Sequence, residues 1–127
     1  MSGHYDGWIG VDLDGTLAIY DGWKGPDQIG APIPEMVERV KAWLADGRAV
    51  RIMTARVYAP MDDAIRQMDA AIAMRAIQNW SWQHLGQVLS VTCVRDYGMI
   101  ELWDDRAVQV VPNTGKRAIV AAEQGRL

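Results

Sequence analysis

A short apolar run near the amino end of the chain stops abruptly at a group of acidic residues. Trp8, Ile9 and Val11 are followed directly by the segment Asp12-Leu13-Asp14-Gly15-Thr16. An apolar run of this length that ends in an acidic, glycine-containing segment is typical of a buried strand followed by a functional loop. This feature therefore predicts a sheet-based fold in which polar side chains gather at a strand end.

The length and composition of the chain indicate one globular domain. The 127 residues leave no room for a separate substrate domain, so we expect residues 1–127 to share a single core. Hydrophobic residues make up 50% of the chain and charged residues 23%, which is ordinary usage for a packed protein rather than for a disordered one.

Strand-like and helix-like stretches alternate along the sequence. Short apolar stretches predict strands over residues 8–12, 49–53, 88–94, 99–103 and 108–111. Helical spacing predicts helices from Pro34 to about Asp46, over about 60–86 and from Lys116 to about Gln124, and breakers in 17–34 indicate a hairpin-like flap. This order predicts an α/β fold, with a doubly wound, mainly parallel, five-stranded Rossmann-like sheet, helices on both faces and a minimal cap.

Polar residues follow four of the predicted strands. They are Asp12 and Asp14 after the first strand, Thr54 and Arg56 after the second, Arg95 and Asp96 after the third, and Asp104 and Asp105 after the fourth. In a doubly wound sheet, ligands bind in a crevice at the carboxyl ends of the strands. We therefore expect these four groups to converge on one site.

The acidic members of this set predict a magnesium site. Carboxylates at the end of a buried strand are costly without a partner, and a bound cation would satisfy them. An all-oxygen set suits magnesium, which usually shares itself with a phosphate. Zinc is not favoured, because cysteine and histidine are not clustered. The predicted oxygen donors are Asp12, Asp14, Asp104 and Asp105.

Neighbouring residues predict that the ligand is a phosphate. Gly15 allows the backbone to turn sharply, and the amides around Gly15 and Thr16 can cradle phosphate oxygens. Thr54 offers a hydroxyl for another phosphate oxygen. Together with a carboxylate nucleophile, these parts predict phosphoryl transfer, in which positioning and charge neutralisation supply most of the catalysis.

Several other classes of function are not favoured. A calcium loop counted from Asp12 would need glycine and an acid where this chain has Leu17 and Trp23. The net charge of -3 does not attract an extended polyanion, although a short nucleic-acid end stays open as a substrate. The lone Cys93, the lack of an apolar signal core in residues 1–7 and the lack of a run of roughly 18 apolar residues predict a cytoplasmic protein that is not in a membrane.

On these motifs the chain resembles the phosphatases of the haloacid dehalogenase-like superfamily. The matching parts are the Asp-x-Asp-Gly-Thr pattern after the first strand, Thr54 after the second, and the acidic pair Asp104-Asp105 after a later apolar strand. The resemblance implies that Asp12 is a nucleophile that forms an aspartyl phosphate, and that Asp14 is a general acid and then a base. It also implies a magnesium ion bound by Asp12, the Asp14 carbonyl and Asp105.

The remaining roles complete this expectation. Because adjacent strand residues face opposite ways, we expect Asp105 to be a direct metal ligand and Asp104 to support it. Thr54, with Ala55 and Arg56 beside it, would bind the phosphoryl group. The family's third motif is a lysine, and no lysine lies between Lys41 and Lys116. Arg95 is the best substitute and Arg56 a second candidate, with a fork geometry that differs from that of lysine.

The substrate and two rival functions stay open. A small cap, in the resemblance, goes with an open site, a covering homo-oligomer or a bulky substrate, and the three aromatic residues Tyr20, Trp23 and Tyr58 could line such a mouth. The Thr-Ala-Arg sequence of the second motif and the Asp-Asp-Arg sequence of the fourth are similar to those of phosphatases that act on nucleotides or polynucleotide 3′ ends. The expected partner is a small phosphorylated substrate or a nucleic-acid end. A phospho-accepting receiver, which orders its motifs differently along the chain, and a catalytically silent binding domain are the alternatives.

Overall fold

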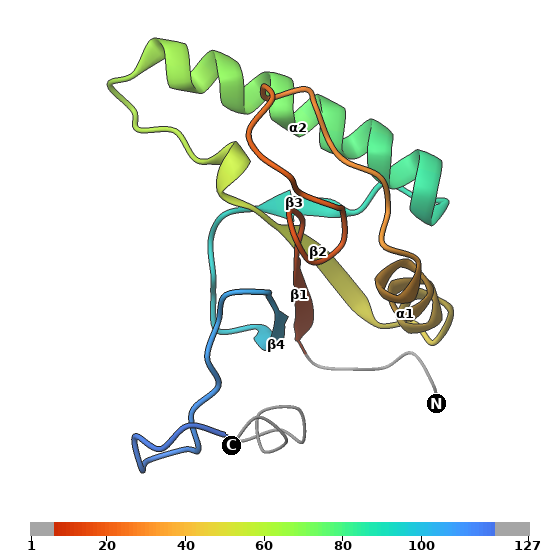
Figure 1. Cartoon of the computed structure of the whole chain (residues 1–127), viewed down its shortest axis with the longest axis vertical. Helices are drawn as coiled ribbons and strands as arrows, with labels where there is room; N and C mark the ends of the chain where they lie inside the picture. Colours follow the sequence, from red (N-terminus) through yellow and green to blue (C-terminus); the bar gives the residue numbers. More distant parts are fainter. Residues whose placement is uncertain (1–6, 119–127) are drawn as a thin grey trace.

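A four-stranded parallel sheet forms the centre of the computed structural model, which describes residues 7–118 (Figure 1). The strand order is β3-β2-β1-β4. The strands are β1 (Trp8–Asp12), β2 (Ala49–Met53), β3 (Ser90–Thr92) and β4 (Met99–Trp103). The parallel α/β class that the alternation of strands and helices predicts is confirmed.

Two α-helices connect the strands, and local sequence explains where they begin and end. α1 (Pro34–Ala45) starts with a proline, which suits a position where no intrahelical N–H is needed. α2 (Ala64–Leu85) is capped by Asp63, whose side chain accepts a hydrogen bond from Arg66 N at 2.9 Å, and it ends at Gly86 with a φ of 81°. Within the described residues, neither helix combines the length and apolar character that a membrane crossing requires.

The hydrophobic core lies between the sheet and these two helices. Ile9 and Val11 of β1 share one buried cluster with Val40 of α1 and Ile77 of α2. The β1-α1-β2 and β2-α2-β3 units step across the sheet in the same direction, and such crossovers are right-handed, so both helices cover the same face. Contact between α1 and α2 agrees with this arrangement. Each fully buried aliphatic side chain stabilises the fold by about 1.5–3 kcal/mol.

Parts of the predicted architecture are wrong for the described residues. The stretch 108–111 does not join the sheet, because Val110 forms an isolated antiparallel bridge with Arg117 instead. Residues 116–118 are not helical, and the rest of the predicted closing helix lies outside the described residues. The helices of residues 7–118 cover one face of the sheet rather than two. The connection 93–98 between β3 and β4 is the physical reason, since it is too short for a crossover helix.

The connection 93–98 instead closes the amino end of the sheet. Asp96 Oδ1 accepts hydrogen bonds from Trp8 Nε1 and from Gly98 N, each at 2.8 Å. The Arg51 guanidinium lies over the Trp8 ring, 4.4 Å from its centroid, and approaches Asp96 Oδ2 at 3.5 Å. Trp8 is therefore only 3% exposed, although it alternates away from the helix-covered face. Asp96 supports the fold at the end of the sheet opposite to the carboxyl end of β1.

A hairpin-like flap, residues 17–34, follows β1 and reaches toward α2 (Figure 1). Ile19 N donates a hydrogen bond to Ala31 O at 2.8 Å across the two arms of the flap. A Cβ atom at Gly30 would overlap the carbonyl oxygen of Ile19, so the close approach of the arms requires glycine. Trp80 Nε1 of α2 donates to Gly30 O at 3.0 Å and attaches the flap to the body of the protein.

We expect Asp96 to make the free energy of unfolding depend on acidic pH. The hydrogen bond from Trp8, then that from Gly98, and the nearby charge of Arg51 hold the pKa of the Asp96 carboxyl below its ordinary value of 3.8. A carboxyl with a lowered folded-state pKa stabilises the protein above the unfolded-state pKa, and this contribution is lost as the pH falls through the folded-state pKa. Asp96→Asn keeps a hydrogen-bond acceptor without the charge.

Urea unfolding of the wild type and of Asp96→Asn, at about pH 6 and about pH 3, measures this dependence. The wild type should lose more stability than the variant between the two pH values. Equal losses in both proteins would show that the charge of Asp96 does not stabilise the fold.

Candidate active site

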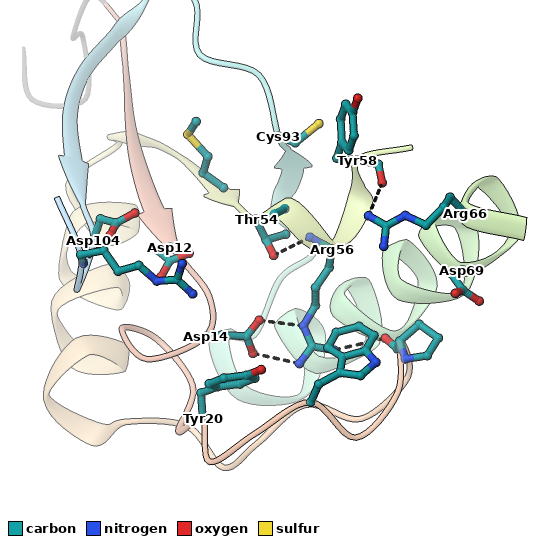
Figure 2. Close-up of a pocket in the computed structure, with 15 residues that line it drawn as sticks. Asp12, Asp14, Tyr20, Thr54, Arg56, Tyr58, Arg66, Asp69, Cys93 and Asp104 are labelled. Carbon is teal, nitrogen blue, oxygen red and sulfur yellow. Dashed lines mark hydrogen bonds and ion pairs between the residues drawn. The ribbon is translucent and has the colours of Figure 1, made fainter. Parts of the chain in front are cut away.

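The carboxyl ends of the strands open into one cavity of about 770 Å³ (Figure 2). β1 lies between β2 and β4, so the chain leaves β1 toward one side of the sheet and later returns on the other. Parallel sheets bind ligands at such a reversal of strand order. The lining residues are Asp12, Asp14, Tyr20, Trp23, Pro26, Met53, Thr54, Ala55, Arg56, Tyr58, Arg66, Asp69, Cys93, Asp104 and Arg106.

Three aspartates, which we call the acidic cluster, meet beside this cavity. Asp12 ends β1, Asp104 and Asp105 follow β4, and one oxygen from each lies within 4.8 Å of the others. We expected Asp105 to be a direct ligand and Asp104 to support it, yet both offer an oxygen here. Both residues lie beyond the end of β4, where the alternation of a strand no longer turns neighbouring side chains to opposite faces.

The acidic cluster is electrostatically unfavourable without a cation. Burial first, and then the hydrogen bond and charges of the neighbouring carboxyls of Asp105, Asp104 and Asp14, raise the pKa of the Asp12 carboxyl to about 7. A positive charge among the three carboxylates would favour their ionised form. Their all-oxygen donor set is the kind that magnesium prefers. The residues present therefore fit the predicted cofactor.

Gly15 and Thr16 support the acidic cluster. The φ of Gly15 is 87°, and a Cβ atom there would lie 2.5 Å from Asp105 Oδ2, so only glycine allows this carboxylate so close to the backbone. The Thr16 hydroxyl lies 3.4 Å from Asp12 Oδ2 and 3.4 Å from Asp105 Oδ1. Both residues line a smaller hollow of about 300 Å³ next to α1. The sequence predicts that the amides of these residues bind phosphate, whereas here Gly15 N donates to Ala18 O at 2.8 Å and Thr16 N to Leu13 O at 3.3 Å.

Thr54 stands directly after β2, where the sequence places it. It is 4% exposed, and its Oγ1 accepts a hydrogen bond from Arg56 N at 3.2 Å, which caps the short 3₁₀ helix η1 (Ala55–Val57). Its amide donates to Thr92 O at 2.9 Å and holds the end of β2 against β3. Thr54 and Ala55 both line the cavity, and their binding of a phosphoryl group stays a prediction.

Asp14 is paired with Arg56 instead of joining the acidic cluster (Figure 2). Arg56 Nε donates to Asp14 Oδ2 at 2.8 Å and Nη2 to Asp14 Oδ1 at 2.9 Å. Nη1 donates to the flap carbonyls of Gly25 at 3.2 Å and Pro26 at 3.4 Å, and the guanidinium lies 4.9 Å from the centroid of the Trp23 ring. The Arg56 side chain is 5% exposed. Its contacts connect the flap to Asp14, and they engage the guanidinium that we predicted to bind phosphate.

Arg95 lies outside the cavity. It is exposed and belongs to the connection 93–98, which runs from β3 to the amino end of β4. The sequence suggests a strand over 88–94 that would bring Arg95 and Asp96 to the crevice, but β3 ends earlier, and Cys93 is the residue of this connection that lines the cavity. In this structure Arg95 therefore does not take the position expected for the family's lysine.

Charged residues that the sequence prediction missed also line the cavity. Arg106 follows the acidic pair directly, and its place in the Asp-Asp-Arg triplet was a usable signal. Arg66 and Asp69 lie three residues apart on α2, a spacing that puts both on one side of a helix. Nothing in the sequence pattern separates them from ordinary solvated helix residues, so only the packing of α2 beside η1 reveals them.

We expect the ion pair between Asp14 and Arg56 to stabilise the fold, because both partners are largely buried and form two short hydrogen bonds. Arg56→Met should lower the free energy of unfolding by about 1–3 kcal/mol, since it leaves a shielded carboxylate without its partner. Asp14→Asn should also destabilise the fold, because it leaves the buried Arg56 guanidinium without its counter-charge and with one of the two hydrogen bonds lost.

A double-mutant cycle measured by urea unfolding separates the coupling free energy of the ion pair from the cost of lost packing. The two substitutions together should cost less than the sum of their separate costs, by about 1 kcal/mol or more. Additive losses would mean that the pair contributes nothing beyond its separate side chains.

Comparison with known proteins found no match, so a functional assignment depends on the geometry of the site. The chain matches no protein-family model, no curated protein and no solved structure. The resemblance to the haloacid dehalogenase-like superfamily therefore stays a prediction from short motifs, and the arrangement of the acidic cluster, Asp14 and Thr54 carries the functional argument.

Proposed function

We propose that the protein is a magnesium-dependent phosphomonoester hydrolase that works through an aspartyl-phosphate intermediate. The observation that carries this proposal is the position of Asp12. Its carboxylate belongs to the acidic cluster and also lines the cavity that Asp14 and Thr54 line. A nucleophile, an acid and a phosphate-binding hydroxyl are thus available to one bound ester, which supports phosphoryl transfer because positioning supplies much of the catalysis.

The proposed reaction has two steps. An oxygen of the Asp12 carboxylate bonds to phosphorus and the ester P–O bond breaks. Asp14, which must first leave its ion pair with Arg56 and take up a proton when the substrate binds, gives that proton to the leaving oxygen. Water then attacks the phosphorus of the aspartyl phosphate, Asp14 takes a proton from the water, and inorganic phosphate leaves while the Asp12 carboxylate is restored. The Thr54 hydroxyl donates a hydrogen bond to a phosphoryl oxygen. Magnesium, when bound, neutralises charge on the carboxylates and the phosphate.

We assign the positive charge of the third motif to Arg106. Arg106 lines the cavity beside Asp104, whose Oδ1 accepts a hydrogen bond from Arg106 N at 2.7 Å. In the described part of the chain, no side-chain ion pair holds the Arg106 guanidinium. Arg56 is engaged by Asp14, and Arg95 lies outside the cavity. Arg106 is therefore the better placed cation for a phosphate next to Asp12.

Asp12→Asn should abolish the release of phosphate from p-nitrophenyl phosphate, with a loss of at least about 10³-fold, because an amide is a poor nucleophile. Asp62→Asn is a matched control, since Asp62 is exposed and does not line the cavity. Wild-type activity should also vanish when magnesium is removed by a chelator.

The outcome distinguishes the rival functions. A phosphorylated Asp12 that persists for minutes to hours without turnover would indicate a phospho-accepting domain. If alkyl and aryl phosphates give neither turnover nor phosphorylated protein, a catalytically silent binding domain is indicated and the hydrolase proposal is wrong.

Arg106→Gln should lower kcat/KM by about tenfold or more, because it removes a positive charge that would stabilise the phosphoryl group; the loss is smaller than for a donor in an enclosed site, because Arg106 is exposed. Arg95→Gln removes the same charge from outside the cavity and should change kcat/KM by less than about twofold. A larger loss of kcat/KM in Arg95→Gln than in Arg106→Gln would show that Arg95, and not Arg106, is the cation of the third motif. Thermal unfolding of both variants confirms that they remain folded.

A further inference from the structure

The cavity extends well beyond the acidic cluster. In Figure 2, Asp12 lies on one side of the cavity, and Tyr58, Arg66 and Asp69 lie on the other. We call these three residues the distal end. A volume of about 770 Å³ is in the range that holds a drug-sized ligand, so a phosphate group at Asp12 fills a small part of it. The space predicts a substrate with a large group attached to the phosphate.

Partly exposed aromatic side chains line the cavity. Tyr58 follows η1 and is 53% exposed, and Trp23 of the flap is 58% exposed. The Arg56 guanidinium lies over the Trp23 ring, which fixes the ring without enclosing it. Tyr20 of the flap lines the same cavity. Partly exposed rings around a cavity offer flat apolar surfaces on which a planar ligand group can stack.

Hydrogen-bonding groups of both kinds accompany these rings. Arg66 Nη2 donates to the carbonyl oxygen of Tyr58 at 3.5 Å, which places the guanidinium beside the main chain of Tyr58. Asp69 follows one turn later on α2 and contributes a carboxylate acceptor. Within the described residues, no ion pair joins Arg66 to Asp69. Both side chains therefore retain capacity for a ligand that has acceptors and donors of its own.

We propose, on the basis of the proposed hydrolase function, that the substrate is a nucleoside monophosphate whose base occupies the distal end. A nucleobase has a flat face for stacking and an edge that carries both donors and acceptors, which a phenyl ring or a sugar does not combine. Tyr58 stacks on the base, while Arg66 and Asp69 bind its edge.

The charges favour a mononucleotide over a polynucleotide. Four aspartates and three arginines line the cavity, and the chain as a whole carries a net charge of -3. Protein surfaces that follow a long phosphate backbone are instead rich in lysine and arginine. A single phosphate, placed where magnesium offsets the acidic cluster, does not require such a surface.

The test compares adenosine and guanosine 5′-monophosphates with ribose 5-phosphate, which has the same phosphate and sugar without a base. With magnesium present, the wild type should show a kcat/KM at least about tenfold higher for one of the nucleotides, in line with the stacking of one base on an aromatic side chain. Tyr58→Leu should bring the ratio of nucleotide to ribose 5-phosphate toward one. Tyr97→Leu is the matched control, because Tyr97 is fully exposed and does not line the cavity.

Other outcomes overturn the inference or separate it from the proposed function. Equal kcat/KM for nucleotides and ribose 5-phosphate, or the same ratio in Tyr58→Leu and Tyr97→Leu, would refute base recognition while hydrolysis stands. Preference for a 3′-phosphorylated oligonucleotide over both mononucleotides by more than about tenfold would replace the mononucleotide with a polynucleotide end. If nothing is hydrolysed, we measure the binding of the same nucleotides by calorimetry. Binding that Tyr58→Leu weakens would support base recognition at the distal end while the hydrolase function fails. No binding would refute base recognition.

Discussion

The whole site depends on the pairing of β1 with a parallel strand on each side. Parallel neighbours cannot be joined by a tight turn, so the chain leaves β1 by way of the flap and α1 and returns on the opposite edge as β4. This reversal brings Asp12 together with the acidic pair after β4. Pairing on both edges also buries β1, so the Asp12 carboxyl at its end is half-buried, and this burial contributes most to its raised pKa.

Arg56 gives this arrangement a second connection. Its guanidinium binds Asp14 and two carbonyls of the flap, while its amide binds the Thr54 hydroxyl. Arg56 thus binds both the flap that carries Trp23 and Asp14, the proposed acid. In our proposal the shape of the cavity and the position of Asp14 are therefore set together, because a movement of the flap must change the contacts of Arg56.

The sequence predicted the parallel α/β class of the fold and the residues of the cavity that follow β1, β2 and β4 directly, because apolar strand runs and the polar residues after them are local signals. It failed where tertiary contacts decide. The apolar stretch 108–111 has strand character, yet it pairs with the segment around Arg117 instead of the sheet. A connection of six residues, 93–98, carries Asp96 to Trp8, so this part of the chain faces the opposite end of the sheet.

The sequence by itself determined which chemical groups stand at the strand ends, since the residues after an apolar strand must follow it to the edge of the sheet. Thr54, Asp12, Asp14 and the pair Asp104-Asp105 are placed by that rule, whereas Asp96 is not. The tertiary structure decided which partner each group meets. Asp14 pairs with Arg56 and is not part of the acidic cluster. Arg106 lines the cavity, and Arg95 does not. These choices depend on the lengths of connections and the packing of distant segments, which no local spacing of residues specifies.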